Sequence, residues 1–399
     1  MERLILKEGA YEEVVSLPAR VAAAISKMGV ANVVPRSDGD WAISGVSKVG
    51  VIHVEGWQVE IAPKVPIARL FFMMGFSSEQ KFWQDHSIAL GSEAGLLDSI
   101  AKSFIRQVRV ALARGLHQAY ETFDDAVPMV RGRLDIPAQI GRRGGLSLPA
   151  QVRFDEYTVD TAENRLLLSA SLRLLALPSL GAADRAAILK LIQRFEGVTS
   201  LRRGDALPQV HFQRLNERYR GAIGLARLIL KNSSLEHRQG DNTASGFLFD
   251  TWRIFEDFVS AALQTSLAKR GQRVELQYRS YLDQGRQILI RPDVVVRSDG
   301  SVRAAVDAKY KAEKNGRFPH ADVYQMLAYC LNFGLSEGHL VYAKGEDDVK
   351  SYVIDPPNVT IHCHALNLDQ TPEQLLSDVD LLAERITGPI TVQMPVLPL

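Results

Sequence analysis

The chain has 399 residues, a formal net charge of +1 and 46% hydrophobic residues. This length predicts two or three domains with ordinary hydrophobic cores, and the near-zero net charge excludes a histone-like polycation, so any nucleic-acid contact must come from local basic patches. The two cysteines, Cys330 and Cys363, exclude a disulfide framework and a Cys/His zinc site.

The N-terminal third predicts a small β-rich unit. Its first stretch, MERLILKEGAYEEV, has an apolar run too short for a signal-peptide core. No later stretch reaches the roughly 20 apolar residues of a membrane helix, so we expect a cytoplasmic protein without membrane contacts. Residues 40–65 alternate apolar and polar side chains between glycine turns, which predicts short strands. We expect Trp41 and Trp57 in the core of this unit and His53 as a half-buried strand residue.

Helical periodicity follows the β-rich unit. Apolar residues at three- and four-residue spacing predict an amphipathic helix over residues 94–120 and further helices over 164–177, 182–195 and 212–230. Between the first two helices the chain carries RGRLD and the glycine-rich GRRGG, which predict loops.

A change in composition predicts a domain boundary. The stretch SSLEHRQGDNTASG, residues 233–246, has few apolar residues and many turn formers. We therefore divide the chain into a β-rich and helical region, 1–235, and an α/β domain, 236–399. In the second part the predicted order is helix, three strands, helix and strand, so we expect a fragment that begins near residue 240 to fold alone.

Charged residues interrupt the hairpin predicted for residues 291–311, RPDVVVRSDGSVRAAVDAKYK. Side chains alternate across a strand, so Asp307 and Lys309 point to one face, and Asp293 can face the same pocket from the neighbouring strand. Two carboxylates beside one lysine favour a Mg²⁺ site. Such a site suits phosphodiester hydrolysis, in which the metal acidifies a bound water and Lys309 holds or helps to deprotonate that water. An exposed hairpin with ordinary salt bridges is the alternative.

The arrangement of these residues resembles a known group of enzymes. Asp293 followed by Asp307-Ala308-Lys309, in the order helix–strand–strand–strand–helix, resembles the PD-(D/E)xK nuclease superfamily. More specifically, the chain is similar to the McrC family, the nuclease subunits of McrBC restriction systems, which act on DNA containing 5-methylcytosine. The similarity runs in pieces from about residue 50 to 345, in VGVIHVEGWQVEIAPKVP, RGLHQAY, VRGRLD, FDEYTVDTAENRLLLSA, FDTWRIFEDFV, IRPDVVV, VDAKYK and DVYQMLAYC.

The resemblance implies a fold and a set of site residues. The fold is α+β and multidomain: an N-terminal β-rich and helical partner-docking region precedes a C-terminal α/β domain of the PD-(D/E)xK restriction-endonuclease type. Asp293 and Asp307 would be metal ligands and Lys309 the catalytic lysine. Glu256 would be a further metal ligand or a neighbour of the ligands, and Gln325 would lie near the scissile phosphate.

The resemblance also implies a partner. In the family the N-terminal region docks into a McrB ring, an AAA+ GTPase, and stimulates its GTP hydrolysis. This sequence has no GxxxxGK[ST] loop, so we expect GTP on the partner and not on this chain. The modified cytosine of the double-stranded DNA is expected to be recognised by the partner as well, because no base-flipping pocket is identifiable here.

Arginines in the first half are candidates for contact with DNA or with the partner. They are Arg131, Arg133, Arg142, Arg143 and Arg165. Solvated loop positions are an equal interpretation of the first four, and a salt bridge at a helix start capped by Asp160 or Thr161 is the alternative for Arg165. Two other functions stay open: a non-enzymatic activator of an AAA+ GTPase, and a stand-alone PD-(D/E)xK repair nuclease.

Overall fold

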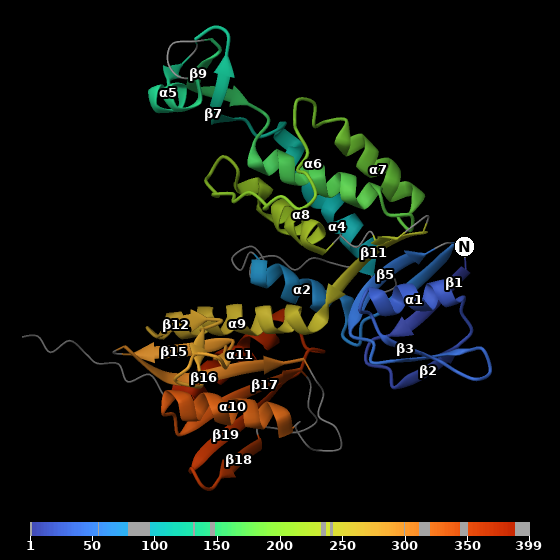
Figure 1. Cartoon of the computed structure of the whole chain (residues 1–399), viewed down its shortest axis with the longest axis vertical. Coiled ribbons are helices and arrows are strands. Elements are labelled where there is room, and N and C mark those ends of the chain that lie inside the picture. The colour runs from blue at the N-terminus through green and yellow to red at the C-terminus, as the bar shows by residue number, and fades with distance from the viewer. Residues whose placement is uncertain are drawn as a thin grey trace, which may run out of the picture. The chain divides into compact units, whose positions relative to one another are not determined.

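The chain forms a multidomain α+β structure (Figure 1). The computed structural model describes residues 2–54, 56–78, 96–130, 132–143, 148–232, 237–239, 242–298, 300–310, 320–343 and 350–387. It divides into two compact units: unit 1 comprises Met1–Leu96 together with Leu235–Leu399, and unit 2 comprises Leu97–Ser234. In these described ranges no helix is both long enough and apolar enough to cross a bilayer.

The first sheet of unit 1 combines strands from both ends of its sequence. In spatial order these are β1 (Glu2–Lys7), β6 (Trp57–Ala62), β5 (Lys48–Val54), β11 (Asn242–Asp250) and β10 (His237–Gln239). The antiparallel pairing of β5 with β11 depends on Gly50, which has a φ of 133°. A Cβ atom at Gly50 would lie 2.0 Å from the carbonyl oxygen of Phe247, so only glycine lets the two backbones approach.

A smaller sheet and one helix complete the N-terminal part of unit 1. The sheet has the order β2 (Glu12–Val15), β4 (Trp41–Ser44) and β3 (Asn32–Pro35), and α1 (Ala19–Lys27) packs with it. Trp41 and Trp57 pack against the shared apolar core, which confirms the prediction for both side chains. His53 is buried rather than half-buried, with 7% of its surface exposed, and burial lowers its pKa.

A six-stranded sheet forms the C-terminal part of unit 1. Its order is β12 (Arg273–Leu276), β15 (Val294–Ser298), β16 (Ser301–Lys309), β17 (Glu337–Ala343), β19 (Val359–Leu366) and β18 (Lys350–Ile354). The predicted hairpin is confirmed as β15 and β16, which pair antiparallel. The first strand of this sheet in the chain, β12, is short, because the chain leaves the sheet after it and forms a separate pair, β13 (Ser280–Tyr281) with β14 (Leu289–Ile290).

Helices cover both faces of this sheet (Figure 1). α9 (Thr251–Lys269) packs on β12, β15 and β16, and α11 (Pro372–Thr387) packs on α9 and β19. α10 (His320–Phe333) packs on β16, β17 and β19. The predicted helix, hairpin, helix and strand are present as α9, β15–β16, α10 and β17. The structure adds β13 and β14 before the hairpin and β18, β19 and α11 after β17, which the prediction did not include.

Shared packing explains why the two ends of the chain form one unit. The division predicted at residue 235 coincides with one edge of unit 2, but residues 1–96 group with the C-terminal part. Besides the pairing of β11 with β5, α2 (Ile67–Ser78) packs on α9, where Phe72 and Phe76 lie 5.8 and 5.5 Å from Phe258 between ring centroids.

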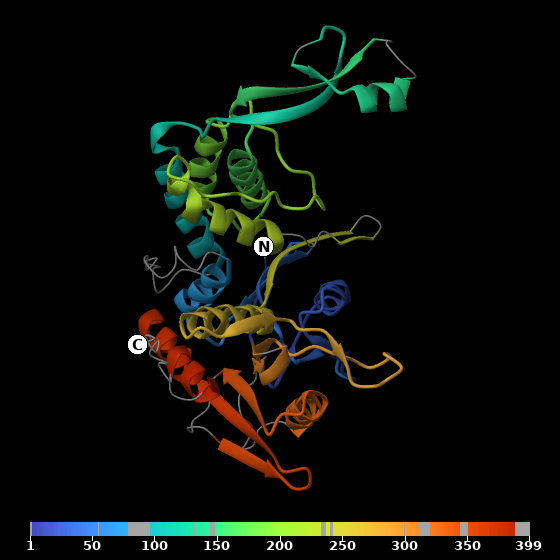
Figure 2. The ribbon, with the colours of Figure 1, turned by 90° about the vertical axis from the view of Figure 1, so that its left-hand side faces the viewer.

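Unit 2 consists of a helical body and a three-stranded sheet. The helices are α4 (Leu96–Ala111), α6 (Ala162–Leu175), α7 (Ala182–Ile192) and α8 (Arg220–Asn232). The sheet has the order β7 (Ala119–Val127), β9 (Ala150–Thr158) and β8 (Arg133–Leu134), and Figure 2 shows β7 and β9 as a long ribbon with α5 (Ile136–Arg143) near its far end.

Three predictions for unit 2 are wrong. The helix expected to reach Tyr120 ends at Ala111, because Gly115 takes a left-handed φ of 85° and the chain then enters β7. The helix expected from residue 212 begins at Arg220, after the short 3-10 turn η2 (Glu217–Tyr219). The segment expected as loops contains β8 and α5 in its described part.

Candidate active site

Three of the predicted site residues meet at one end of the β15–β16 hairpin. Lys309 contacts the carboxylate of Asp307 directly, as expected for two side chains on the same face of β16. Asp293 lies just before β15, and its Oδ2 accepts a hydrogen bond of 2.9 Å from the backbone N–H of Ala308, the residue between the other two. Asp293 is 7% exposed and Asp307 only 2% exposed, so the two carboxyl groups are buried.

The apolar hairpin core holds these charged groups in place. Val294–Val296 and Ala304–Val306 are buried, and the two segments pair across the hairpin. β16 then pairs in parallel with β17 as far as Lys309, so both flanks of this strand end are fixed. The charged residues therefore stand where the buried layer ends, on strands that cannot shift register without exposing apolar side chains.

Gln277 fixes Asp293, and the sequence analysis did not identify it. Its backbone N–H donates to the carbonyl oxygen of Asp293 at 2.8 Å, and its Nε2 donates to the carboxylate Oδ1 at 2.7 Å. Gln277 has a φ of 51°, an uncommon left-handed conformation for a residue with a side chain. The surrounding RVELQYRSYL contains no glycine or asparagine, the residues that usually mark such a conformation, so sequence reasoning had no signal.

Burial and charge perturb the ionisation of the pair beside Asp293. Burial raises the pKa of Asp307 to about 6, and the charge of Asp293 adds to this effect while Lys309 opposes it. Burial works against the charged form of Lys309, but the carboxylates of Asp307, Asp293 and Asp322 together raise its pKa. Lys309 is therefore a firmly charged ammonium, held among more negative charge than it can neutralise.

Glu256, the predicted acidic residue of α9, belongs to the same electrostatic site. Its side chain is half-buried, and burial raises its pKa to about 7. The charge of Asp293 adds to this shift, and Lys309 partly offsets it. A carboxyl group with this pKa changes its protonation near neutral pH, as is common at catalytic sites.

α10 brings three further side chains toward the hairpin end. Gln325 is exposed and donates a hydrogen bond of 2.6 Å from Nε2 to the hydroxyl of Tyr329, one helical turn later. Tyr329 is buried in the apolar core, and burial, with a contribution from Asp307, raises its pKa to about 12. Asp322, which the sequence analysis did not identify, is buried and acts on Lys309 through its charge.

The donor chemistry of this site fits Mg²⁺. Asp293, Asp307 and Glu256 carry more negative charge than one lysine offsets, and Oδ2 of Asp307 contacts the ammonium of Lys309 but accepts no well-formed hydrogen bond from any described residue. Mg²⁺ prefers carboxylate oxygens and keeps several waters. Within the described ranges, no three Asp, Glu, His or Cys side chains form a ready-made metal cage, so water and substrate oxygens would have to complete the shell.

The structure describes the side chains of two of the predicted arginines of unit 2, Arg165 and Arg133. Arg165 forms a bidentate pair with Asp160, at 2.8 and 2.7 Å, while Thr161 caps α6, so its interpretation as a helix-start salt bridge is confirmed. Arg133 is an exposed residue of β8. Arg131 lies outside the described residues, as do the side chains of Arg142 and Arg143.

Comparisons with known proteins give one family and one fold. Residues 44–343 match the model of a family described as the McrBC 5-methylcytosine restriction system component. A solved structure from Thermococcus gammatolerans, a half-complex from a tetradecameric assembly of McrB AAA+ hexamers with bound McrC, contains a similar chain: TM-score 0.59, 18% identity, 96% of this chain and 100% of that chain covered. The cryo-EM structure of the Thermococcus gammatolerans McrBC complex aligns with a TM-score of 0.37 and 18% identity over 66% of this chain and 88% of that one. No curated protein matches the chain.

Proposed function

The chain belongs to the family of McrBC 5-methylcytosine restriction system components, and from this premise we propose that it is a McrC-like endonuclease subunit with a PD-(D/E)xK centre. It cleaves phosphodiester bonds of double-stranded DNA with Mg²⁺. The observation that carries the proposal is the meeting of Asp293, Asp307 and Lys309 at one strand end, with both carboxyl groups buried.

The residues of this site divide the work of hydrolysis. A bound Mg²⁺ supplies an acidified water and stabilises charge on the phosphate. Asp293, just before β15, and Asp307, on β16, would hold the cation, and Gln277 keeps the Asp293 carboxylate oriented. Lys309, anchored by Asp307, directs its ammonium toward the attacking water or a phosphate oxygen. Glu256, with a pKa of about 7, accepts or releases a proton beside them near neutral pH.

The proposed partner is a McrB-like AAA+ GTPase ring, which binds GTP and recognises the modified cytosine. The fold shared with the Thermococcus gammatolerans chain supports this assignment. Unit 2 offers a surface for docking, because large apolar side chains are exposed on its sheet, on the segments next to its strands and on α5, an unusual arrangement for a surface that faces only water. They are Tyr120, Met129, Ile136, Ile140, Leu148 and Tyr157.

Reconstitution with the partner tests the proposal through two readouts, DNA cleavage and GTP hydrolysis. Asp307→Asn removes one charged metal ligand, so cleavage of methylated duplex in GTP and Mg²⁺ should fall by at least about a hundredfold. Stimulation of the partner's GTPase should stay at the wild-type level. Asp380→Asn, an exposed change on α11, is the matched control and should cleave normally.

Each other outcome points to a different function. Wild-type cleavage by Asp307→Asn would place the nuclease centre elsewhere. GTPase stimulation without cleavage by the wild type would make the chain a non-enzymatic activator. Cleavage by the wild type alone, without partner or GTP, would make it a stand-alone nuclease.

A further inference from the structure

Unit 2 is basic, although the net charge of the whole chain is close to zero. Unit 2, Leu97–Ser234, contains 21 lysines and arginines against 13 aspartates and glutamates, so acidic residues predominate in unit 1. Such a local excess of positive charge attracts polyanions even when the whole protein is close to neutral.

Part of this charge forms a row on α4 and the 3-10 turn that follows it, η1 (Leu112–Arg114). Between residues 102 and 114 every exposed side chain is either basic or small and apolar, and the spacing of three to four residues places them on one face. They are Lys102, Arg106, Arg109, Val110, Ala113 and Arg114. None of the four cations has an ion-pair partner in the part of the chain that the structure describes.

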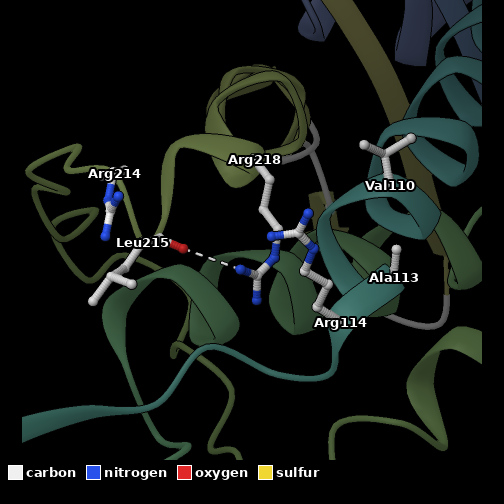
Figure 3. A pocket seen from close by; sticks show the side chains of 6 residues that line it. All are labelled: Val110, Ala113, Arg114, Arg214, Leu215 and Arg218. Atoms are coloured by element: carbon white, nitrogen blue, oxygen red, sulfur yellow. Dashed lines mark hydrogen bonds between the residues drawn. The ribbon is translucent and has the colours of Figure 1, made fainter.

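A cavity of about 630 Å³ opens at the end of this face (Figure 3). Val110, Ala113 and Arg114 line it on one side, and Arg214, Leu215 and Arg218 line it on the other. Arg218 is held in place, because its Nε donates to the carbonyl of Ala111 at 2.8 Å and its Nη1 donates to the carbonyl of Leu215 at 3.0 Å, the bond drawn in Figure 3.

The charged side chains that line the cavity are all arginines. Arg114 and Arg214 are exposed, and no acidic side chain lines the cavity among the described residues. Backbone carbonyls orient the guanidinium of Arg218 without neutralising it. Three guanidinium groups around one space repel one another, and a bound anion offsets that repulsion. Phosphate suits them, because a guanidinium donates two parallel hydrogen bonds to its oxygens.

We propose that the exposed face of α4 and the arginine cavity at its end bind the phosphate backbone of nucleic acid. Lys102 to Arg114 spans 12 residues, about 18 Å at 1.5 Å per residue. Duplex DNA presents one charge per roughly 1.7 Å of its axis, so a row of this length faces several phosphates. A folded protein surface mixes charges of both signs, so it matches an unbroken row of cations less well. The choice of DNA as the polyanion rests on the proposed function.

Fluorescence anisotropy with the full-length chain and a labelled 30-base-pair duplex tests this inference. Measurements in EDTA, without the partner, separate binding from cleavage. Arg114→Gln/Arg214→Gln should weaken binding about tenfold or more, and the slope of log K against log salt concentration should fall by about 2, one for each lost phosphate contact. Lys190→Gln/Arg202→Gln removes two exposed charges elsewhere in unit 2 and should change the affinity less than twofold. Equal melting temperatures establish that both variants fold.

Two results would overturn the inference. Equal losses of DNA affinity in the cavity variant and in its control would mean that binding depends only on the overall charge of the protein. Binding of poly-glutamate that depends on Arg114 and Arg214, with duplex binding unchanged, would assign the cavity to an acidic protein. The same measurement with single-stranded DNA shows whether one strand is enough for binding. Because Mg²⁺ and the partner are absent, failure of cleavage and failure of this surface are separate outcomes.

Discussion

Glu256 and Asp307 keep their protons to a higher pH than ordinary carboxyl groups do, because they are buried beside other negative charge. Such a site is electrostatically unfavourable when it is ionised and holds no cation. The free energy of unfolding therefore depends on pH through these two groups.

The sign follows from the raised pKa of Glu256. The folded state binds its proton more tightly than the unfolded state, so the stability that Glu256 contributes is complete below about pH 4.5 and is lost as pH rises through about 7. In EDTA, Glu256→Gln should match the wild type at pH 5 and exceed it by about 1–3 kcal/mol at pH 8, a range that allows for solvent screening of a half-buried group.

Thermal melts at the two pH values measure this difference. The buried His339 and His364 have lowered pKa values and shift the wild-type profile in the opposite direction, but they cancel when the variant is compared with the wild type. Glu12→Gln, an exposed change in unit 1, should show no pH-dependent difference. If Glu256→Gln differed from the wild type in stability by the same amount at both pH values, the electrostatic description of the site would be contradicted.

The charged residues of the site could be predicted from the sequence, but the residues that hold them in position could not. The alternation of a strand was enough to place Asp307 and Lys309 on one face, and the turn placed Asp293 beside them. Gln277 could not be found, because its role depends on a left-handed backbone conformation that its residue type does not favour. Asp322 comes from a helix, and only the packing of α10 on β16 brings it near Lys309.

At the scale of elements, local periodicity predicted α9, the β15–β16 hairpin, α10 and β17, whose patterns of apolar residues are regular. It failed where pairing is long-range. The polar segment expected as a boundary contains the first part of strand β11, which is stabilised by β5 almost two hundred residues earlier in the sequence. Nothing within residues 233–246 signals that pairing.

The pairing of β11 changes the expectation for fragments. A chain that begins near residue 240 lacks the partner strand of β11 and the α2 surface that covers Phe258 of α9. It also lacks Glu8, which accepts hydrogen bonds from Thr251 and Tyr310. We now expect residues 240–399 alone to melt without a cooperative transition, whereas Met1–Leu96 joined to Leu235–Leu399 by a flexible linker should melt cooperatively. Cooperative melting of the shorter fragment would restore the predicted domain.

At the scale of the whole molecule, the division into two units matches the proposed division of tasks. Unit 1 carries the acidic, buried residues of the proposed nuclease centre, and unit 2 carries the excess of basic residues. The net charge of the whole chain does not show this separation, because the net charges of the two units nearly cancel. The sequence analysis expected nucleic-acid contacts from local basic patches, but a helix face at the mouth of a cavity becomes visible only once burial is known.

The central claim is that Asp293 and Asp307 together hold the divalent cation of the nuclease. Diffraction at the manganese absorption edge, from crystals of the full chain with Mn²⁺ and a short duplex, locates that cation directly. We predict an anomalous peak between the two carboxylates in the wild type and none there in Asp307→Asn. A peak at another site, with these carboxylates unoccupied or with the same occupancy in both proteins, would contradict the claim.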